Sequence, residues 1–141
     1  LDKLEQAIDR SERTHSGELR LAIEAGMEPY DALRGRTPRD RALELFASLR
    51  VWDTEENSGV LIYLQLVDHR IEIVADRGIV RKVDQPQWDA ICRRMETRFR
   101  AGDFEGGALA AVDDITALLQ AHFPPGDTNP DELPDRPVIL V

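Results

Sequence analysis

The chain has 141 residues, 42% hydrophobic and 32% charged, which is the size and balance of one globular domain and excludes a disordered chain. Its formal net charge of −9 repels phosphate backbones and anionic lipid head groups, so nucleic-acid and membrane-surface binding are disfavoured, whereas cations and basic partners are attracted. The single cysteine, Cys92, excludes an internal disulfide and a cysteine-based zinc site.

The first 50 residues predict a helix, a strand and a second helix. Leu1, Leu4 and Ile8 recur at helical spacing, which indicates an amphipathic helix ending near Arg13. Residues 18–24 mostly alternate between apolar and polar side chains, as in a β-strand, and residues 26–35 form an irregular loop. Thr37, Pro38 and Asp40 have the spacing of a helix start, and the helix that follows buries a stripe of Ala42, Leu45, Phe46 and Leu49.

A β-hairpin is predicted in the middle of the chain. Residues 52–58 are polar and acidic and form a connecting loop. Residues 59–67 are almost continuously apolar, which is typical of a strand covered on both faces. A two-residue break at Asp68–His69 leads into a second, alternating strand over residues 70–76, so the two strands pair antiparallel.

Two helices and a tail complete the chain. Asp84 and Pro86 begin a helix whose predicted core stripe is Trp88, Ile91, Cys92, Met95 and Phe99. After a stop at Ala101–Asp103, a further helix places Phe104, Ala108, Val112, Ile115, Leu119 and Phe123 on one face and ends before Pro124. We expect residues 1–123 to form the domain and residues 124–141 to form an extended, proline-rich, acidic C-terminal tail.

The order of elements is therefore α-β-α-β-β-α-α. Two strands joined by a helix form a right-handed crossover if they are parallel, and the hairpin then adds an antiparallel strand. Helices must cover both faces of the apolar central strand. The sequence thus predicts an α/β protein, a three-layer α/β/α sandwich with a small mixed sheet.

Three segments carry a resemblance to a known family. They are an Asn-Ser-Gly loop running into an apolar strand (residues 57–64), the second hairpin strand with its glycine turn (70–79), and an aromatic, basic, Gly-Asp-aromatic segment between the last two helices (99–107). In this order they resemble the TPM domain family, over residues 1–123, and the chain is similar to its bacterial members. One departure is Asp76, which stands where the family usually has a glycine, so we expect a differently shaped turn there.

The resemblance implies several properties. Members include a plant thylakoid-lumen protein linked to photosystem II repair with reported acid phosphatase activity, exported or membrane-anchored bacterial proteins, and an accessory subunit of an animal receptor. Calcium binding is associated with some of them. For this chain the resemblance therefore implies the fold, a candidate calcium site, and an unidentified protein partner associated with a membrane or a larger assembly.

The hairpin itself places acidic residues together. Antiparallel strands bring the start of the first beside the end of the second, so loop 53–57 is expected near residues 76–78. Carboxylate, amide and carbonyl oxygens are the ligands that calcium takes. The leading candidate ligands are Asp53, Asn57 and Asp76, with Glu55 and Glu56 as further candidates; the alternative is a solvated acidic turn whose side chains bond backbone amides.

Three hypotheses of function follow. The favoured one is a non-enzymatic module that binds calcium and a protein partner. A metal-assisted phosphatase is the alternative, with Arg77, Arg81 and Lys82 as the nearest cationic groups; no P-loop or cysteine nucleophile is present. The third is a structural domain whose acidic loop binds nothing. The longest apolar run is too short to cross a bilayer, so we expect a soluble domain. The sequence starts at Leu1 without a methionine, so we expect that upstream residues were removed, and the domain is cytoplasmic or exported depending on them.

Overall fold

The structure is a computed structural model that describes residues 2–26, 33–54, 56–124 and 137–140. Within these residues the elements follow the order predicted for the first 123 positions, with one short helix and one short strand in addition. In chain order they are α1 (Asp2–Glu12), β1 (Glu18–Glu24), α3 (Pro38–Ser48), β2 (Gly59–Gln65), β3 (Arg70–Ala75), α4 (Arg77–Val80), α5 (Gln85–Arg100), α6 (Phe104–His122) and β4 (Val138–Leu140).

The strands form one mixed sheet in the order β3-β2-β1-β4. Strand β1 pairs parallel with β2, from Glu18 opposite Gly59 to Glu24 opposite Gln65. The hairpin partner β3 pairs antiparallel with β2, and β4 lies parallel to β1 on its other side. The β1–α3–β2 unit is thus the predicted crossover between parallel strands, and the hairpin is confirmed.

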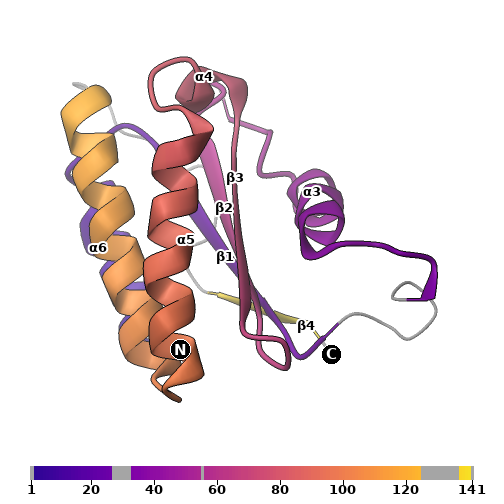
Figure 1. Cartoon of the computed structure of the whole chain (residues 1–141). Coiled ribbons are helices and arrows are strands. Elements are labelled where there is room, and N and C mark those ends of the chain that lie inside the picture. Colours follow the sequence, from indigo (N-terminus) through magenta and orange to yellow (C-terminus); the bar gives the residue numbers. More distant parts are fainter. Residues whose placement is uncertain (1, 27–32, 55, 125–136, 141) are drawn as a thin grey trace.

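Helices cover the sheet on both faces, which confirms the predicted three layers (Figure 1). Helices α1, α5 and α6 pack on one face, against side chains at alternate positions such as Leu19, Ile62 and Ile73. Helix α3 covers the other face, where the positions between them, among them Leu61 and Val74, meet Ala42 and Leu45 of the helix. Since both faces are covered, every residue of β2 is buried, as its continuous apolar run predicts.

The predicted start of α3 is confirmed in detail. The hydroxyl of Thr37 accepts a hydrogen bond from the amide of Asp40 at 3.1 Å, and the carboxylate of Asp40 accepts one from the amide of Thr37 at 3.0 Å. This reciprocal pair satisfies two amides that the first helical turn leaves free, and Pro38 occupies the first turn without losing a bond. The crossover helix therefore has a fixed beginning.

Several boundaries differ from the sequence expectations. The hairpin connection is longer than the predicted break at Asp68–His69, because β2 ends at Gln65 and β3 begins at Arg70. Residues 66 and 67 instead donate their amides to carbonyls at and just beyond the end of β1. Asp76 does not continue β3 but caps the short helix α4. Residues 138–140 of the expected tail pair with β1, and residues 125–136 of that tail lie outside the described residues.

Candidate functional site

The two loops at one end of the hairpin meet, as the antiparallel pairing predicts. The amide of Gly78 donates to the carbonyl oxygen of Asn57 at 3.0 Å, and the amide of Asp76 donates to that of Gly59 at 2.9 Å. Asn57 adopts a left-handed conformation with φ of 52°, which turns the chain sharply into β2. The segment before β2 is therefore held against the turn after β3 by main-chain bonds.

The approach of the two loops depends on Gly78. A Cβ atom at this position would lie 2.5 Å from the carbonyl oxygens of both Glu56 and Asn57, closer than real Cβ contacts allow. The two carbonyl oxygens of this cradle thus lie against the Cα of Gly78, a contact that only a glycine permits. Carbonyl oxygens in such a cradle are the kind of main-chain ligand that a hard cation takes.

Asp76 contributes the side chain that is most informative at this junction. Its Oδ1 accepts a hydrogen bond from the amide of Arg77 at 2.8 Å, which caps α4. Its Oδ2 is shielded from solvent and has no hydrogen-bond partner among the residues that the structure describes. A buried carboxylate oxygen without a partner costs free energy, so this atom is suited to a cation or a water molecule.

The other predicted ligands lie differently. Asp53 is exposed and its carboxylate forms an ion pair with Arg50 at 2.8 Å. The carbonyl oxygens of Glu56 and Asn57 lie at the cradle, while Glu55 lies outside the described residues. Within the part of the chain that the structure describes, no group of three or more His, Cys, Asp or Glu residues is placed to hold a metal ion. The structure thus places the Asp76 carboxyl group and the carbonyl oxygens of residues 56 and 57 at this turn.

The two tryptophan residues, Trp52 and Trp88, lie in different environments. Trp88 is completely buried in the helix-side core, which explains its place on the α5 stripe. Trp52 is 46% exposed beside the acidic loop, and its indole N–H donates a hydrogen bond to the carbonyl oxygen of Ala47 at 3.1 Å. The guanidinium of Arg50 lies over the Trp52 ring, 5.3 Å from its centroid. Trp52 is thus a partly exposed surface residue that directly precedes the acidic loop.

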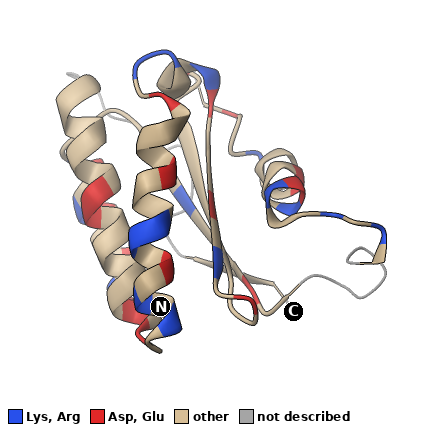
Figure 2. Ribbon diagram, in the orientation of Figure 1, with Lys and Arg blue, Asp and Glu red and all other residues tan. Residues whose placement is uncertain are grey.

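The charges around this end of the fold are mixed. Figure 2 shows basic residues at α4 and the turn that follows it, beside acidic positions. Arg77 and Arg81 are exposed and form no ion pair with the described residues, whereas Lys82 donates to the carbonyl of His122 at 3.3 Å. Two free guanidinium groups therefore stand next to the segment that carries Asp76.

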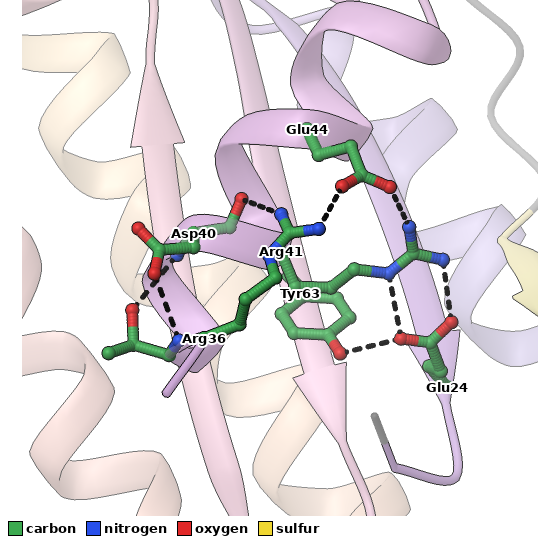
Figure 3. Close-up of polar contacts among 7 residues, drawn as sticks. Glu24, Arg36, Asp40, Arg41, Glu44 and Tyr63 are labelled. Carbon is green, nitrogen blue, oxygen red and sulfur yellow. Dashed lines mark hydrogen bonds and ion pairs between the residues drawn. The ribbon is translucent and has the colours of Figure 1, made fainter. Parts of the chain in front are cut away.

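A second polar cluster, which the sequence reasoning missed, lies under α3 (Figure 3). Arg41 of α3 forms a bidentate pair with Glu24 at the end of β1, with N–O distances of 3.0 and 2.8 Å. The hydroxyl of Tyr63 donates to the same carboxylate at 2.8 Å, and Arg41 also contacts Glu44. Glu24, Tyr63 and Gln65 alternate onto the α3 face of their strands, which is the signal that could have revealed the cluster.

The acid–base properties of this cluster are those of a structural ion pair. Burial alone would raise the pKa of Glu24, but the hydrogen bonds from Arg41 and Tyr63 and the charge of Arg41 outweigh it and lower that pKa. Burial, with the nearby Glu24 charge, raises the pKa of Tyr63 to about 12. Both groups therefore stay in their ordinary protonation states at neutral pH. The amide of Gln65 donates to the Tyr63 hydroxyl at 3.1 Å, while its buried Oε1 has no partner.

Fold and site together define a class: a small α/β domain with a mixed four-stranded sheet and a conformationally constrained acidic turn at one end of its hairpin. The family model for the TPM domain matches residues 1–118, so the chain belongs to the TPM domain family. No helix within the described ranges is long and apolar enough to cross a membrane.

Solved structures of similar fold come from bacteria. The BA42 protein of the psychrophilic Bizionia argentinensis is 28% identical, with a TM-score of 0.85 over 98% of this chain and 90% of that one. The N-terminal domain of a P. gingivalis protein (18% identity, TM-score 0.68, 84% and 72% covered) and that of a Corynebacterium glutamicum protein (12%, 0.63, 90% and 74%) share the fold. The search of curated proteins finds no match.

Proposed function

We propose that this TPM domain is a non-enzymatic module that binds a divalent cation, calcium, between loop 53–57 and turn 76–78, and that it engages a protein partner. The observation that carries the proposal is the Oδ2 atom of Asp76, which is buried and lacks a hydrogen-bond partner within the described part of the chain. Beside this turn, the carbonyl oxygens of Glu56 and Asn57 converge on Gly78. Calcium takes six to eight oxygens and accepts such a mixture of carboxylate, carbonyl and water.

The side chains of the acidic loop complete the proposed ligand set. Asp53 would exchange its exposed ion pair with Arg50 for the cation, which is a small loss because surface ion pairs contribute about 0–1 kcal/mol. Asn57, Glu56 and Glu55 follow it in the same loop. Calcium is favoured over magnesium because carbonyl-rich, irregular ligand sets suit its flexible coordination, whereas magnesium requires near-octahedral geometry.

The protein partner is proposed to bind at the same end of the domain. Trp52 exposes nearly half of its surface next to the acidic loop, and aromatic side chains are enriched in protein interfaces. A partner contacting this loop would respond to calcium, since the cation changes the charge of the surface that it meets. Substitution of Trp52 by Ala should therefore weaken partner binding without altering calcium affinity.

The test is thermal unfolding in EDTA, in calcium and in magnesium. Calcium at a hundred times its dissociation constant should add about 2.7 kcal/mol to the free energy of unfolding, which raises the melting temperature by several degrees. Asp76→Asn should abolish the rise. Because the substitution replaces a carboxyl group whose buried Oδ2 has no partner among the described residues, it should leave the melting temperature in EDTA unchanged or higher.

A matched control is Asp84→Asn, which changes an exposed carboxylate at the start of α5 that makes no capping hydrogen bond. This variant should keep the full calcium response. Equal melting temperatures in EDTA, calcium and magnesium for the unmodified chain would refute the cation site.

A metal-assisted phosphatase is the second candidate, and Arg77 and Arg81 are the observation that favours it. Hydrolysis of a phosphate ester needs cationic groups to stabilise the transferring phosphoryl, and these exposed guanidinium groups flank the proposed cation. Generic phosphoesters should then be hydrolysed by the unmodified chain and not by the Asp53→Ala, Asp76→Ala double variant. Equal rates for the two proteins would exclude hydrolysis and leave the binding module.

A further inference from the structure

The two outer edges of the sheet are closed in different ways. On the β3 edge, the guanidinium of Arg39 from α3 donates to the carbonyl oxygen of Ile73 at 2.6 Å and lies 3.6 Å from the Glu72 carboxylate. A charged side chain that occupies an edge carbonyl prevents another strand from pairing there. The β3 edge is therefore blocked by a side chain of the same domain.

The opposite edge is closed by a separable piece of chain. Strand β4 covers β1 at three positions, with Val138 opposite Ala22 and Leu140 opposite Glu24. None of the three β4 residues is fully buried, and Ile139 is 50% exposed. Among the described elements, β4 packs extensively only against β1, with Leu140 reaching the α3-side core. The strand is held by its edge pairing and by Leu140, and the residue just before it, Pro137, is buried.

The end of α6 and the start of β4 are closer together than fourteen extended residues can reach. The amide of Ser16 donates to the carbonyl of Phe123 at 2.9 Å, so the end of α6 lies beside the start of β1. Ala22, where β4 begins to pair, is six residues further, or about 20 Å along the strand direction. Residues 124–137 can reach at most about 48 Å when extended. The same connection therefore also permits β4 to reach a neighbouring molecule.

We propose that the outer edge of β1 at Ala22–Glu24 is a strand-acceptor site, and that the β4 of a second copy of this chain occupies it in a strand-exchanged dimer. The second copy is the occupant because its Val138–Leu140 segment matches the acceptor in register and side chains, as the chain's own β4 does. In a reciprocal exchange, the β4 of each copy pairs with the β1 of the other, so the dimer retains all the β1–β4 contacts of two monomers. The unfavourable part of the free energy of association is then mainly the entropy lost when two molecules become one. Dimers should accumulate as the protein concentration approaches the effective concentration of the tethered strand, on the order of 1 mM.

The experiment uses two full-length chains in a Cys92→Ala background, one carrying Ile23→Cys and the other Ile139→Cys. These positions are register partners in the β1–β4 pair, so a disulfide can join them. Mixed and equilibrated at about 1 mM, then oxidised, they should give a covalent heterodimer; at about 1 µM the yield should fall at least tenfold. Yields are read by non-reducing electrophoresis and mass spectrometry.

Two controls keep the result decisive. A single chain that carries both Ile23→Cys and Ile139→Cys should form an intramolecular disulfide at low concentration. That disulfide demonstrates that the β1–β4 register survives the substitutions. Mixing Ile139→Cys with Val80→Cys, an exposed position on α4, measures random collision. The proposal is overturned if the double variant forms its intramolecular disulfide but the Ile23→Cys and Ile139→Cys chains give no more covalent heterodimer than the Ile139→Cys and Val80→Cys chains do. It is equally overturned if removal of residues 137–141 leaves dimerisation of the unmodified chain unchanged.

Discussion

The amide of Gly78 donates a hydrogen bond to the carbonyl oxygen of Asn57 at 3.0 Å, joining the turn after β3 to the loop before β2. The two residues are distant along the hairpin but belong to neighbouring strand ends. The bond forms because Gly78 has no side chain to keep the two carbonyl oxygens of residues 56 and 57 away. One close main-chain approach thus sets the geometry of the acidic turn.

Substituting Gly78 tests this approach directly. In Gly78→Ala the new Cβ would lie 2.5 Å from two backbone oxygens, so one of the two loops must move. We expect a loss of about 1–3 kcal/mol, which lowers the melting temperature by several degrees, together with loss of any calcium response. Gly26→Ala is the matched control, because its Cβ would make only an ordinary 3.7 Å contact with Val67. A Gly78→Ala variant as stable as Gly26→Ala would contradict this account.

The sequence predicts the parts of the fold that local periodicity and capping determine. The alternation of residues 18–24 predicts β1 with its observed bounds, and Thr37 with Asp40 predicts the start of α3. Helix α4 has a single turn, and β4 has three residues whose partner lies near the other end of the chain. Elements this short do not show a periodic pattern of apolar residues. Such short elements are determined by tertiary contacts instead.

At the candidate site, too, the sequence predicts the path of the main chain but not the contacts of the side chains. The hairpin geometry predicts that loop 53–57 meets residues 76–78, and the main-chain bonds confirm that contact. The orientation of each side chain could not be predicted, because it depends on neighbours such as Arg50, which binds Asp53. The Glu24–Arg41 pair was missed because only the packing of α3 on the sheet brings the two residues together.

Removing one partner of the Glu24–Arg41 pair should lower the free energy of unfolding, mainly because the other partner is left as a charge without its ion-pair partner. Arg41→Met leaves a largely buried carboxylate with Tyr63 as its one side-chain donor among the described residues, so we expect a loss of about 2–3 kcal/mol. The double variant Glu24→Leu, Arg41→Met should recover part of it, because no unpaired charge remains. Denaturant unfolding of the four proteins in this cycle gives the coupling energy. A double variant whose loss equals the sum of the two single losses would show that the pair is not coupled.

Cys92 should be unreactive in the folded protein. It is buried on α5, and burial, with the nearby carboxylates, raises the pKa of its thiol to about 12, so almost no thiolate exists at neutral pH. We expect iodoacetamide to modify it at pH 8 only through unfolding, with a rate that rises with denaturant as the unfolded fraction does. Val80→Cys in a Cys92→Ala background supplies an exposed comparison that is modified at once. Rapid modification of Cys92 in the native state would mean that the α5 face opens locally.

His15 should make the fold sensitive to acid. The residue is completely buried after α1, where its Nδ1 accepts a hydrogen bond from the amide of Gly17 at 3.1 Å. Nδ1 therefore carries no proton and Nε2 is the protonated nitrogen, 2.9 Å from the hydroxyl of Ser11. The Ser11 hydroxyl lies 2.5 Å from that of Thr116, which donates to the carbonyl of Val112 at 2.5 Å, so the neutral ring begins a chain of donors that ties α1 to α6.

Burial lowers the pKa of His15 to about 4, below its ordinary value of 6.5, so the unfolded chain binds a proton that the folded one does not between these values. Stability from this residue is complete above pH 6.5 and falls as the pH drops toward 4, by about 2 kcal/mol at pH 5. Urea unfolding at pH 5 and pH 8 should show this loss in the unmodified chain and in His122→Gln. In His15→Gln, which cannot titrate, the difference should shrink by the same amount. An unchanged difference in that variant would assign the acid sensitivity to other groups.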